Sequence, residues 1–94
     1  MKIEFDPAKS EKNARERRVP FNLVAAFDFD SAWIVTDDRR DYGEVRYRAI
    51  GQLSDVVAVV VFTMREDAVR VISLRFANRK ERLRYERQNK EAQG

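Results

Sequence analysis

Four strand-like segments joined by short turns constrain the fold of this chain more than any other feature. Their β-branched and large apolar residues lie at 32–36, 45–53, 56–63 and 69–77. Short turns favour antiparallel neighbours, because parallel neighbours need a longer crossover connection. The segment at 56–63 is a nearly continuous valine run, as expected of a central strand covered on both faces. We therefore predict an α+β fold built on a small antiparallel meander.

The N-terminal segment predicts a short strand followed by a surface helix. Ile3 and Phe5 alternate with charged residues, which is typical of a strand at a sheet edge. Asp6 and Pro7 suit the N-cap and the first helical position, because Asp accepts an orphan N–H and Pro has none to donate. The helix predicted from there to about Arg17 is polar nearly all round, so we expect it on the surface.

A second N-terminal helix is predicted after Pro20. It is short and apolar, and it runs from Phe21 to Phe27. We expect four of its side chains to pack against the sheet: Phe21, Leu23, Val24 and Phe27.

The C-terminal part of the chain predicts a strand that continues directly into a helix. The pattern changes after Ala77, where strong helix formers replace the alternating apolar residues. Asn78 and Glu81 have the spacing of a capping box, which specifies the start of the helix. Residues 88–94 are polar and end in glycine, and they are predicted to be a frayed tail.

The composition limits the classes of function. The chain has 94 residues, enough for one domain, and it contains neither cysteine nor histidine. A disulfide framework and the usual zinc and non-haem iron ligand sets are thereby excluded, and we predict no metal and no cofactor. No apolar run approaches the roughly 20 residues that cross a bilayer, so we expect a cytoplasmic protein without membrane contact.

The net charge of +3 is unevenly distributed along the chain. Residues 1–45 carry eight bases and ten acids, whereas residues 46–94 carry eleven bases and six acids. A basic half of this kind attracts polyanions, and also acidic protein surfaces, without specifying which.

A series of short motifs extends over nearly the whole chain in a characteristic order. They are Phe5-Asp6-Pro7-Ala8-Lys9, Asn13, Val19 with Phe21, Glu44 with Arg46, Ile50-Gly51, Val59-Val60-Val61-Phe62-Thr63, Arg70-Val71-Ile72-Ser73 with Arg75 and Ala77, and Glu81-Arg82 with Tyr85-Glu86. Together they resemble the BrnT toxins of type II toxin–antitoxin pairs, which are small ribonucleases with a RelE-like fold. The resemblance implies one toxin domain over residues 1–94 that cleaves RNA.

The resemblance also implies a partner and shows three departures. The implied partner is a BrnA-like ribbon-helix-helix antitoxin that covers the active site and binds operator DNA as a dimer, in a two-plus-two complex. Pro20 stands where a serine cap would be, and Leu74 replaces a small residue of the family signature. The third departure is Glu16-Arg17-Arg18, which stands where such toxins commonly have Lys-His-Gly. Glycine after a helix usually has a left-handed backbone, so Arg18 in that conformation would cost about 1 kcal/mol.

RNA cleavage without a metal needs a base for the 2′-hydroxyl, positive charge for the transition state and an acid for the leaving 5′-oxygen. Arginine grips phosphate through two N–H groups but stays protonated, so it stabilises charge without abstracting a proton. Arg46 and Arg48 alternate onto one strand face, whereas Arg70 and Arg75 differ by five and share a face only if the strand has a bulge.

Proton transfer would fall to Tyr85, Glu81 or Lys80, each of which needs its pKa moved toward 7. The predicted catalytic residues are Arg46, Arg70, Glu81 and Tyr85. The predicted RNA-binding residues are Arg48, Arg75, Arg79, Lys80 and Arg82.

Simpler interpretations stay open for several of these residues. An arginine-rich terminal helix is more often a solvated face than an active site, and Tyr85 is as well explained by packing as by catalysis. Trp33 and Tyr47 are predicted to lie in the core, although aromatic residues beside arginines also suit stacking on unpaired bases. The alternative functions are a BrnT-like module active only in antitoxin binding and transcriptional control, and a basic nucleic-acid-binding domain.

Overall fold

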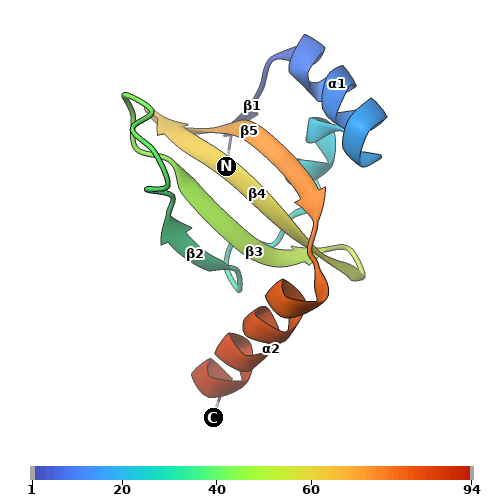
Figure 1. Ribbon diagram of the computed structural model, residues 1–94, viewed down its shortest axis with the longest axis vertical. Coiled ribbons are helices and arrows are strands. Elements are labelled where there is room, and N and C mark those ends of the chain that lie inside the picture. The colour runs from blue at the N-terminus through green and yellow to red at the C-terminus, as the bar shows by residue number, and fades with distance from the viewer. Residues whose placement is uncertain (1, 94) are drawn as a thin grey trace.

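The computed structural model describes residues 2–93, which form a five-stranded sheet with three helices around it (Figure 1). The strands are β1 (Lys2–Glu4), β2 (Trp33–Thr36), β3 (Tyr47–Leu53), β4 (Val56–Arg65) and β5 (Ala68–Phe76). The helices are α1 (Pro7–Arg17), the 3₁₀ helix η1 (Phe21–Ala26) and α2 (Arg79–Gln93). The predicted α+β class is confirmed.

The strand order in the sheet is β1-β5-β4-β3-β2. β2 to β5 form the predicted antiparallel meander with the valine-rich β4 at the centre, and β1 lies at an edge as expected. The sheet as a whole is mixed, however, because β1 pairs in parallel with β5. This parallel pairing is possible because α1, η1 and three strands separate the two segments in the chain, which is ample for a crossover.

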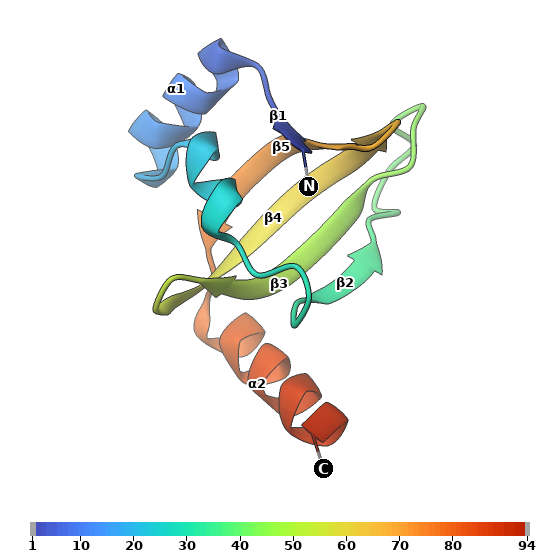
Figure 2. The same cartoon turned by 180° about the vertical axis from the view of Figure 1, so that it is seen from behind.

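The main core lies between the sheet and the N-terminal helices, which cover one face (Figure 2). Asn13 of α1 ties these layers together, because its buried amide donates 2.7 Å hydrogen bonds to the carbonyl oxygens of both Val19 and Leu74. The Ser10 hydroxyl accepts a hydrogen bond from the Phe21 N–H at 2.9 Å. Polar side chains therefore fix the connection between α1 and η1.

The ends of α1 follow from its sequence. Asp6 caps the helix by accepting a hydrogen bond from the Ala8 N–H at 2.9 Å, and Pro7 takes the first helical position, as predicted. At the other end Arg18 has a φ of 66° and a ψ of 19°, the left-handed conformation that the comparison with glycine led us to expect. An arginine therefore carries a backbone strain that glycine would avoid.

The prediction for the second helix was wrong about its last residue and about Leu23. The helix is 3₁₀ and ends at Ala26, one residue before Phe27. With three residues per turn, Phe21, Val24 and Phe27 lie on one side and are buried, whereas Leu23 points away and is 42 % exposed.

The last helix begins with the predicted capping box. The Asn78 side chain accepts a hydrogen bond from the Glu81 N–H at 2.8 Å, and the Glu81 carboxylate accepts one from the Asn78 N–H at 3.0 Å. The helix then continues to Gln93, so residues 88–93 are helical where a frayed tail was predicted, and residue 94 lies outside the described residues. Strong helix formers in this segment account for the extension. The helix projects beyond the end of the sheet (Figure 1).

Candidate active site

A bulge in β5 decides which side chains share the face of the sheet opposite the main core. β5 carries one extra residue, Ile72, relative to β4. Val71 and Leu74, on either side of it, are both buried in the main core. Their neighbours Arg70 and Arg75 therefore both lie on the opposite face. The bulge that Arg70 and Arg75 need in order to share a face is therefore present.

Two more arginines reach this face from β3 and the residues before it. Arg48 is opposite Val61, which in turn is opposite Ser73, the neighbour of the buried Leu74. Arg46 lies two residues earlier and follows the same alternation. We call this surface the arginine face, and its members are Arg46, Arg48, Arg70 and Arg75. Figure 1 views the sheet from this side, and η1 lies behind it.

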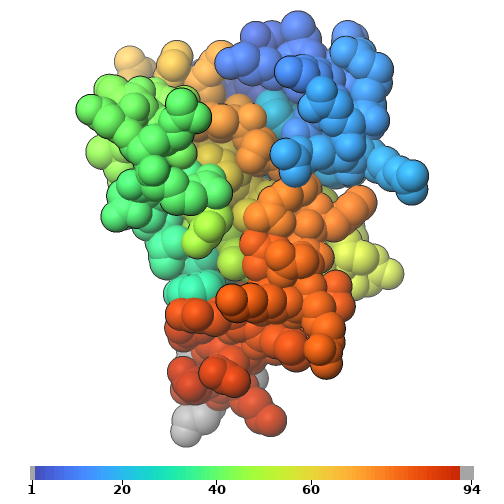
Figure 3. All heavy atoms as spheres, in the orientation of Figure 1, coloured from blue at the N-terminus to red at the C-terminus, as the bar shows by residue number. Residues whose placement is uncertain are grey.

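A cleft of about 190 Å³ lies within the arginine face. Arg46 and Arg70 line it from the sheet, and Lys9 lines it from α1. Figure 3 shows α1 (blue) and the loop between β2 and β3 (green) standing on either side of the strands. Arg46 lies 3.2 Å from Glu44 and Arg70 lies 3.7 Å from Glu4, and all four side chains are partly exposed. Such partly exposed pairs are weak, so an anion can compete for both guanidinium groups.

Arg48 differs from the other arginines of this face. Its Nε is buried without a hydrogen-bond partner, and among residues 2–93 no carboxylate lies within ion-pair distance of its guanidinium. A buried donor without a partner is costly, but the buried Nε is also out of reach of an anion in solvent. Arg48 does not line the cleft. Among the described members of the arginine face, its guanidinium is the one that pairs with no carboxylate, so an anion that reaches it displaces no counter-ion.

Arg75 is held by the last helix. Its two Nη atoms donate to the two carboxylate oxygens of Glu81 at 2.7 and 2.8 Å, a two-pronged ion pair. The pKa of Glu81 is lowered, chiefly by these hydrogen bonds, and the positive charge of Arg48 acts in the same direction. The pKa moves away from 7, so the geometry favours a positioning role for Glu81 over the predicted proton transfer.

Tyr85 is buried, with 6 % of its surface exposed. It belongs to a second small core with Ile50, Val59 and Ala77, beneath α2. Its hydroxyl shares a 3.3 Å hydrogen bond with Ser31, whose hydroxyl donates to Asp28 at 2.7 Å. These contacts attach α2 to the body of the protein and favour the packing interpretation of Tyr85.

The other predicted RNA-binding residues lie on α2, apart from the cleft. Arg79, Lys80 and Arg82 are all exposed. Lys80 lines a groove on α2 together with Leu83, and Arg82 lines another at the end of the β3–β4 hairpin. Neither groove is lined by a member of the arginine face, which leaves these three residues as a separate solvated surface.

The loop between β2 and β3 contains Tyr42, an aromatic residue that the sequence did not lead us to predict at this site. The Arg39 guanidinium donates two hydrogen bonds to Asp37, at 2.8 and 2.9 Å, and these bonds lower the pKa of the buried Asp37 carboxyl to about 2. The Tyr42 hydroxyl donates to the same carboxylate at 3.4 Å. The Arg46 Cζ lies 4.0 Å from the centroid of the Tyr42 ring. The sequence signal that could have pointed to Tyr42 is its place inside a charged turn, four positions before Arg46.

The two aromatic residues predicted to lie in the core are partly buried and pack against it in different ways. Tyr47 stacks on Phe62 of the main core, with ring centroids 5.4 Å apart. Trp33 packs against the small core under α2, where the Arg84 guanidinium covers its ring at 4.7 Å. Neither ring is therefore placed beside the cleft.

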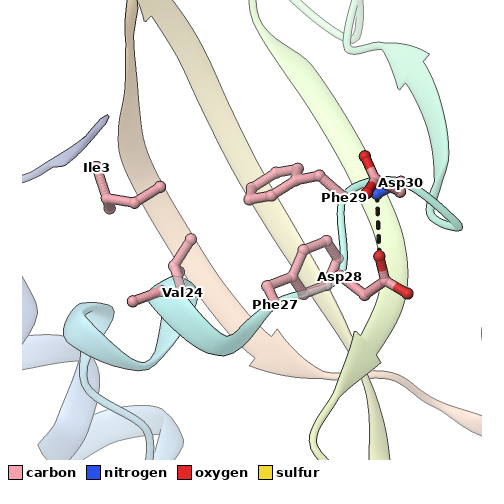
Figure 4. A pocket seen from close by; sticks show the side chains of 7 residues that line it. Ile3, Val24, Phe27, Asp28, Phe29 and Asp30 are labelled. Atoms are coloured by element: carbon pink, nitrogen blue, oxygen red, sulfur yellow. Dashed lines mark hydrogen bonds between the residues drawn. The ribbon is translucent and has the colours of Figure 1, made fainter. Parts of the chain in front are cut away.

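A second pocket, of about 260 Å³, lies on the other side of the sheet (Figure 4). Ile3, Val24, Phe27 and Phe29 line it, and Asp28 and Asp30 stand at its edge. The dashed line in Figure 4 is the 3.1 Å hydrogen bond from the Asp30 N–H to the Asp28 carboxylate. Apolar walls with acidic residues do not suit a phosphate, so this pocket is a poor candidate for RNA binding.

Neither a cluster of metal-ligating side chains nor a membrane-spanning helix is present among residues 2–93. Within residues 2–93 no three acidic side chains come together in a way that could hold a metal ion. None of the helices described there is long and apolar enough to span a membrane.

Comparison with protein families identifies the class of this fold and site. Residues 5–81 match the family model described as "Ribonuclease toxin, BrnT, of type II toxin-antitoxin system". The matched region includes β2 to β5 and all four members of the arginine face, whereas β1 lies just before it. The chain therefore belongs to the BrnT family. No individual curated protein matches it.

Proposed function

We propose that this member of the BrnT family is an endoribonuclease whose active site is the arginine face and which needs no metal ion. The observation that carries the proposal is the bulge in β5, because it places Arg75 on the same side of the sheet as Arg70, Arg46 and Arg48. The unpartnered Arg48 lies among them. The family is described as a ribonuclease toxin, so we take RNA to be the polyanion that binds the arginine face.

In the proposed reaction the arginine face binds the scissile phosphodiester. The 2′-oxygen attacks phosphorus and the 5′-oxygen leaves, so negative charge accumulates on the phosphoryl oxygens in the transition state. Arg48, Arg46 and Arg70 stabilise that charge through fixed N–H donors, which is the contribution a metal ion makes in other nucleases. Guanidinium groups stay protonated near neutral pH, so they transfer no proton.

The proton transfers are assigned to groups that line the cleft. The Glu44 carboxylate lies beside Arg46 and accepts the proton of the 2′-hydroxyl. The Lys9 ammonium of α1 lines the same cleft and donates to the leaving oxygen. In this scheme Glu81 positions Arg75, and Tyr85 holds α2 in place.

The decisive experiment compares cleavage of single-stranded RNA by wild type, Arg48→Ala and Arg15→Ala, each with and without EDTA. Arg15 is an exposed arginine of α1 and serves as the matched control. We expect wild type and Arg15→Ala to cleave equally, and Arg48→Ala to lose roughly a hundredfold or more in kcat/KM. Unfolding in urea should show that both variants are folded.

Two results would contradict the proposal. If Arg48→Ala cleaves as fast as wild type, the active site is elsewhere. If wild type leaves RNA intact and yet binds it with an affinity that falls steeply with salt, the chain is a nucleic-acid-binding module. If EDTA abolishes wild-type cleavage, the claim that no metal ion is needed is refuted, and the assignment of the active site stands.

Membership of a type II family implies a protein antitoxin. We propose that it is a BrnA-like ribbon-helix-helix protein that inhibits cleavage by placing acidic side chains on the arginine face, in a two-plus-two complex that also binds operator DNA. Charge complementarity supports this docking, because the face is cationic. Light scattering of the purified complex measures the stoichiometry, and an Arg48→Ala/Arg70→Ala double variant should bind the antitoxin more weakly than wild type does.

A further inference from the structure

Tyr42 contacts Arg46, one of the residues that line the cleft of the arginine face. It is half-buried in the loop between β2 and β3, and its ring is in contact with the Arg46 guanidinium at 4.0 Å. Arg46 itself lines the cleft. A phosphate held by Arg46 would therefore be next to an aromatic ring.

The position of the Tyr42 ring is fixed from both sides of the loop. Its hydroxyl donates to Asp37, a carboxylate that the two-pronged contact with Arg39 holds in place. The following residue, Gly43, has a φ of 72°, a left-handed conformation that suits glycine, and its N–H donates to Asp41 at 2.9 Å. The 3.4 Å hydrogen bond and the turn at Gly43 restrict the ring before any ligand binds, which lowers the entropic cost of stacking on it.

Two other aromatic residues, Trp33 and Tyr85, lie under α2 on this side of the sheet, and neither lines the cleft. Trp33 is covered by Arg84, and Tyr85 is buried. A second guanidinium, that of the exposed Arg40, has its Cζ 5.9 Å from the Tyr42 ring centroid, near the outer limit of a cation–π contact. A flat ligand displaces such a side chain at little cost.

We propose that Tyr42 is a stacking site for an unpaired nucleobase of the RNA strand whose phosphate is bound by the arginine face. The inference rests on the proposed function and adds a base contact to it. Unpaired bases stack on tyrosine rings and on guanidinium planes, and here Arg46 backs the ring that the base would contact. Stacking of this kind favours single strands over duplexes, because a paired base has no free face.

The test measures binding, so it does not depend on cleavage. The probes are a fluorescein-labelled oligodeoxyadenylate, which has no 2′-hydroxyl to react, and an abasic strand with the same number of phosphates. We expect wild type to bind the adenine strand roughly fivefold or more tightly than the abasic strand. Tyr42→Ala should lose most of that preference, and Tyr42→Phe, which keeps the ring, should retain it.

The outcomes separate this inference from the proposed function. If Tyr42→Ala weakens binding of both strands equally, or of neither, the ring does not stack on a base and the inference is overturned. If wild type shows the preference and Tyr42→Ala lacks it while neither cleaves RNA, base stacking holds and the nuclease assignment fails. Failure of wild type to bind either strand overturns the inference, and the cleavage assay then decides the nuclease assignment separately.

Discussion

Asn13→Ala tests whether α1 and η1 are held to the sheet by one buried amide. The Asn13 side chain is buried, and its nitrogen donates to the Val19 and Leu74 carbonyls at 2.7 Å each. Alanine removes both bonds and leaves two buried acceptors without a donor. Each unsatisfied group costs about 1–3 kcal/mol, and water entering the space left by the amide recovers part of that cost. We expect a loss of about 2–4 kcal/mol.

That loss is large for a chain of this size. The free energy of unfolding of a domain of 94 residues is about 5–14 kcal/mol, at the usual value per residue. The variant should therefore fold at room temperature but melt roughly 10–25 °C below wild type. Urea unfolding followed by the fluorescence of Trp33, the single tryptophan, measures the difference directly.

The control for this experiment is Asn22→Ala. Asn22 is exposed on η1, so the same truncation there should change the free energy of unfolding by less than about 0.5 kcal/mol. If Asn13→Ala costs no more than Asn22→Ala, the two buried hydrogen bonds do not hold the layers together, and the account of the fold is wrong on this point.

Two further predictions concern backbone strain and pH. Arg18→Gly should raise the free energy of unfolding by about 1 kcal/mol, because glycine adopts a φ of 66° without strain; an unchanged urea midpoint would contradict this. Asp37 has a pKa of about 2 when folded, below its ordinary 3.8, so its contribution to stability is full above about pH 5 and is lost as the pH falls toward 2. Asp37→Asn should reduce the fall in the free energy of unfolding between about pH 5 and pH 2 by about 1 kcal/mol. The effect is no larger because Arg39 is exposed, so solvent screens its charge.

Much of the fold could be predicted because local signals and packing agree. The Asp6-Pro7 start of α1, the capping box at Asn78 and the central position of the valine-rich β4 all follow from the chemistry of a few neighbouring residues. The parallel pairing of β1 did not follow, because no local pattern records which strand an edge segment joins. The burial of Tyr85 depends on where α2 docks, which is equally non-local.

The candidate site was only partly predictable, for the same physical reason. Arginine spacing fixes which side chains can share a strand face, but the face of Arg75 depends on whether an extra residue is inserted into the pairing with β4. In a regular strand, Val71 and Leu74 would lie on opposite faces, and only one of them could be buried in the main core.

The bulge at Ile72 resolves that conflict. It places both apolar residues in the core and, as a direct consequence, both arginines on the other side. The hydrophobic effect on one face of β5 thus assembles the cationic surface on the other face. Removing the bulge would cost the protein a core contact and the arginine face one of its members at the same time.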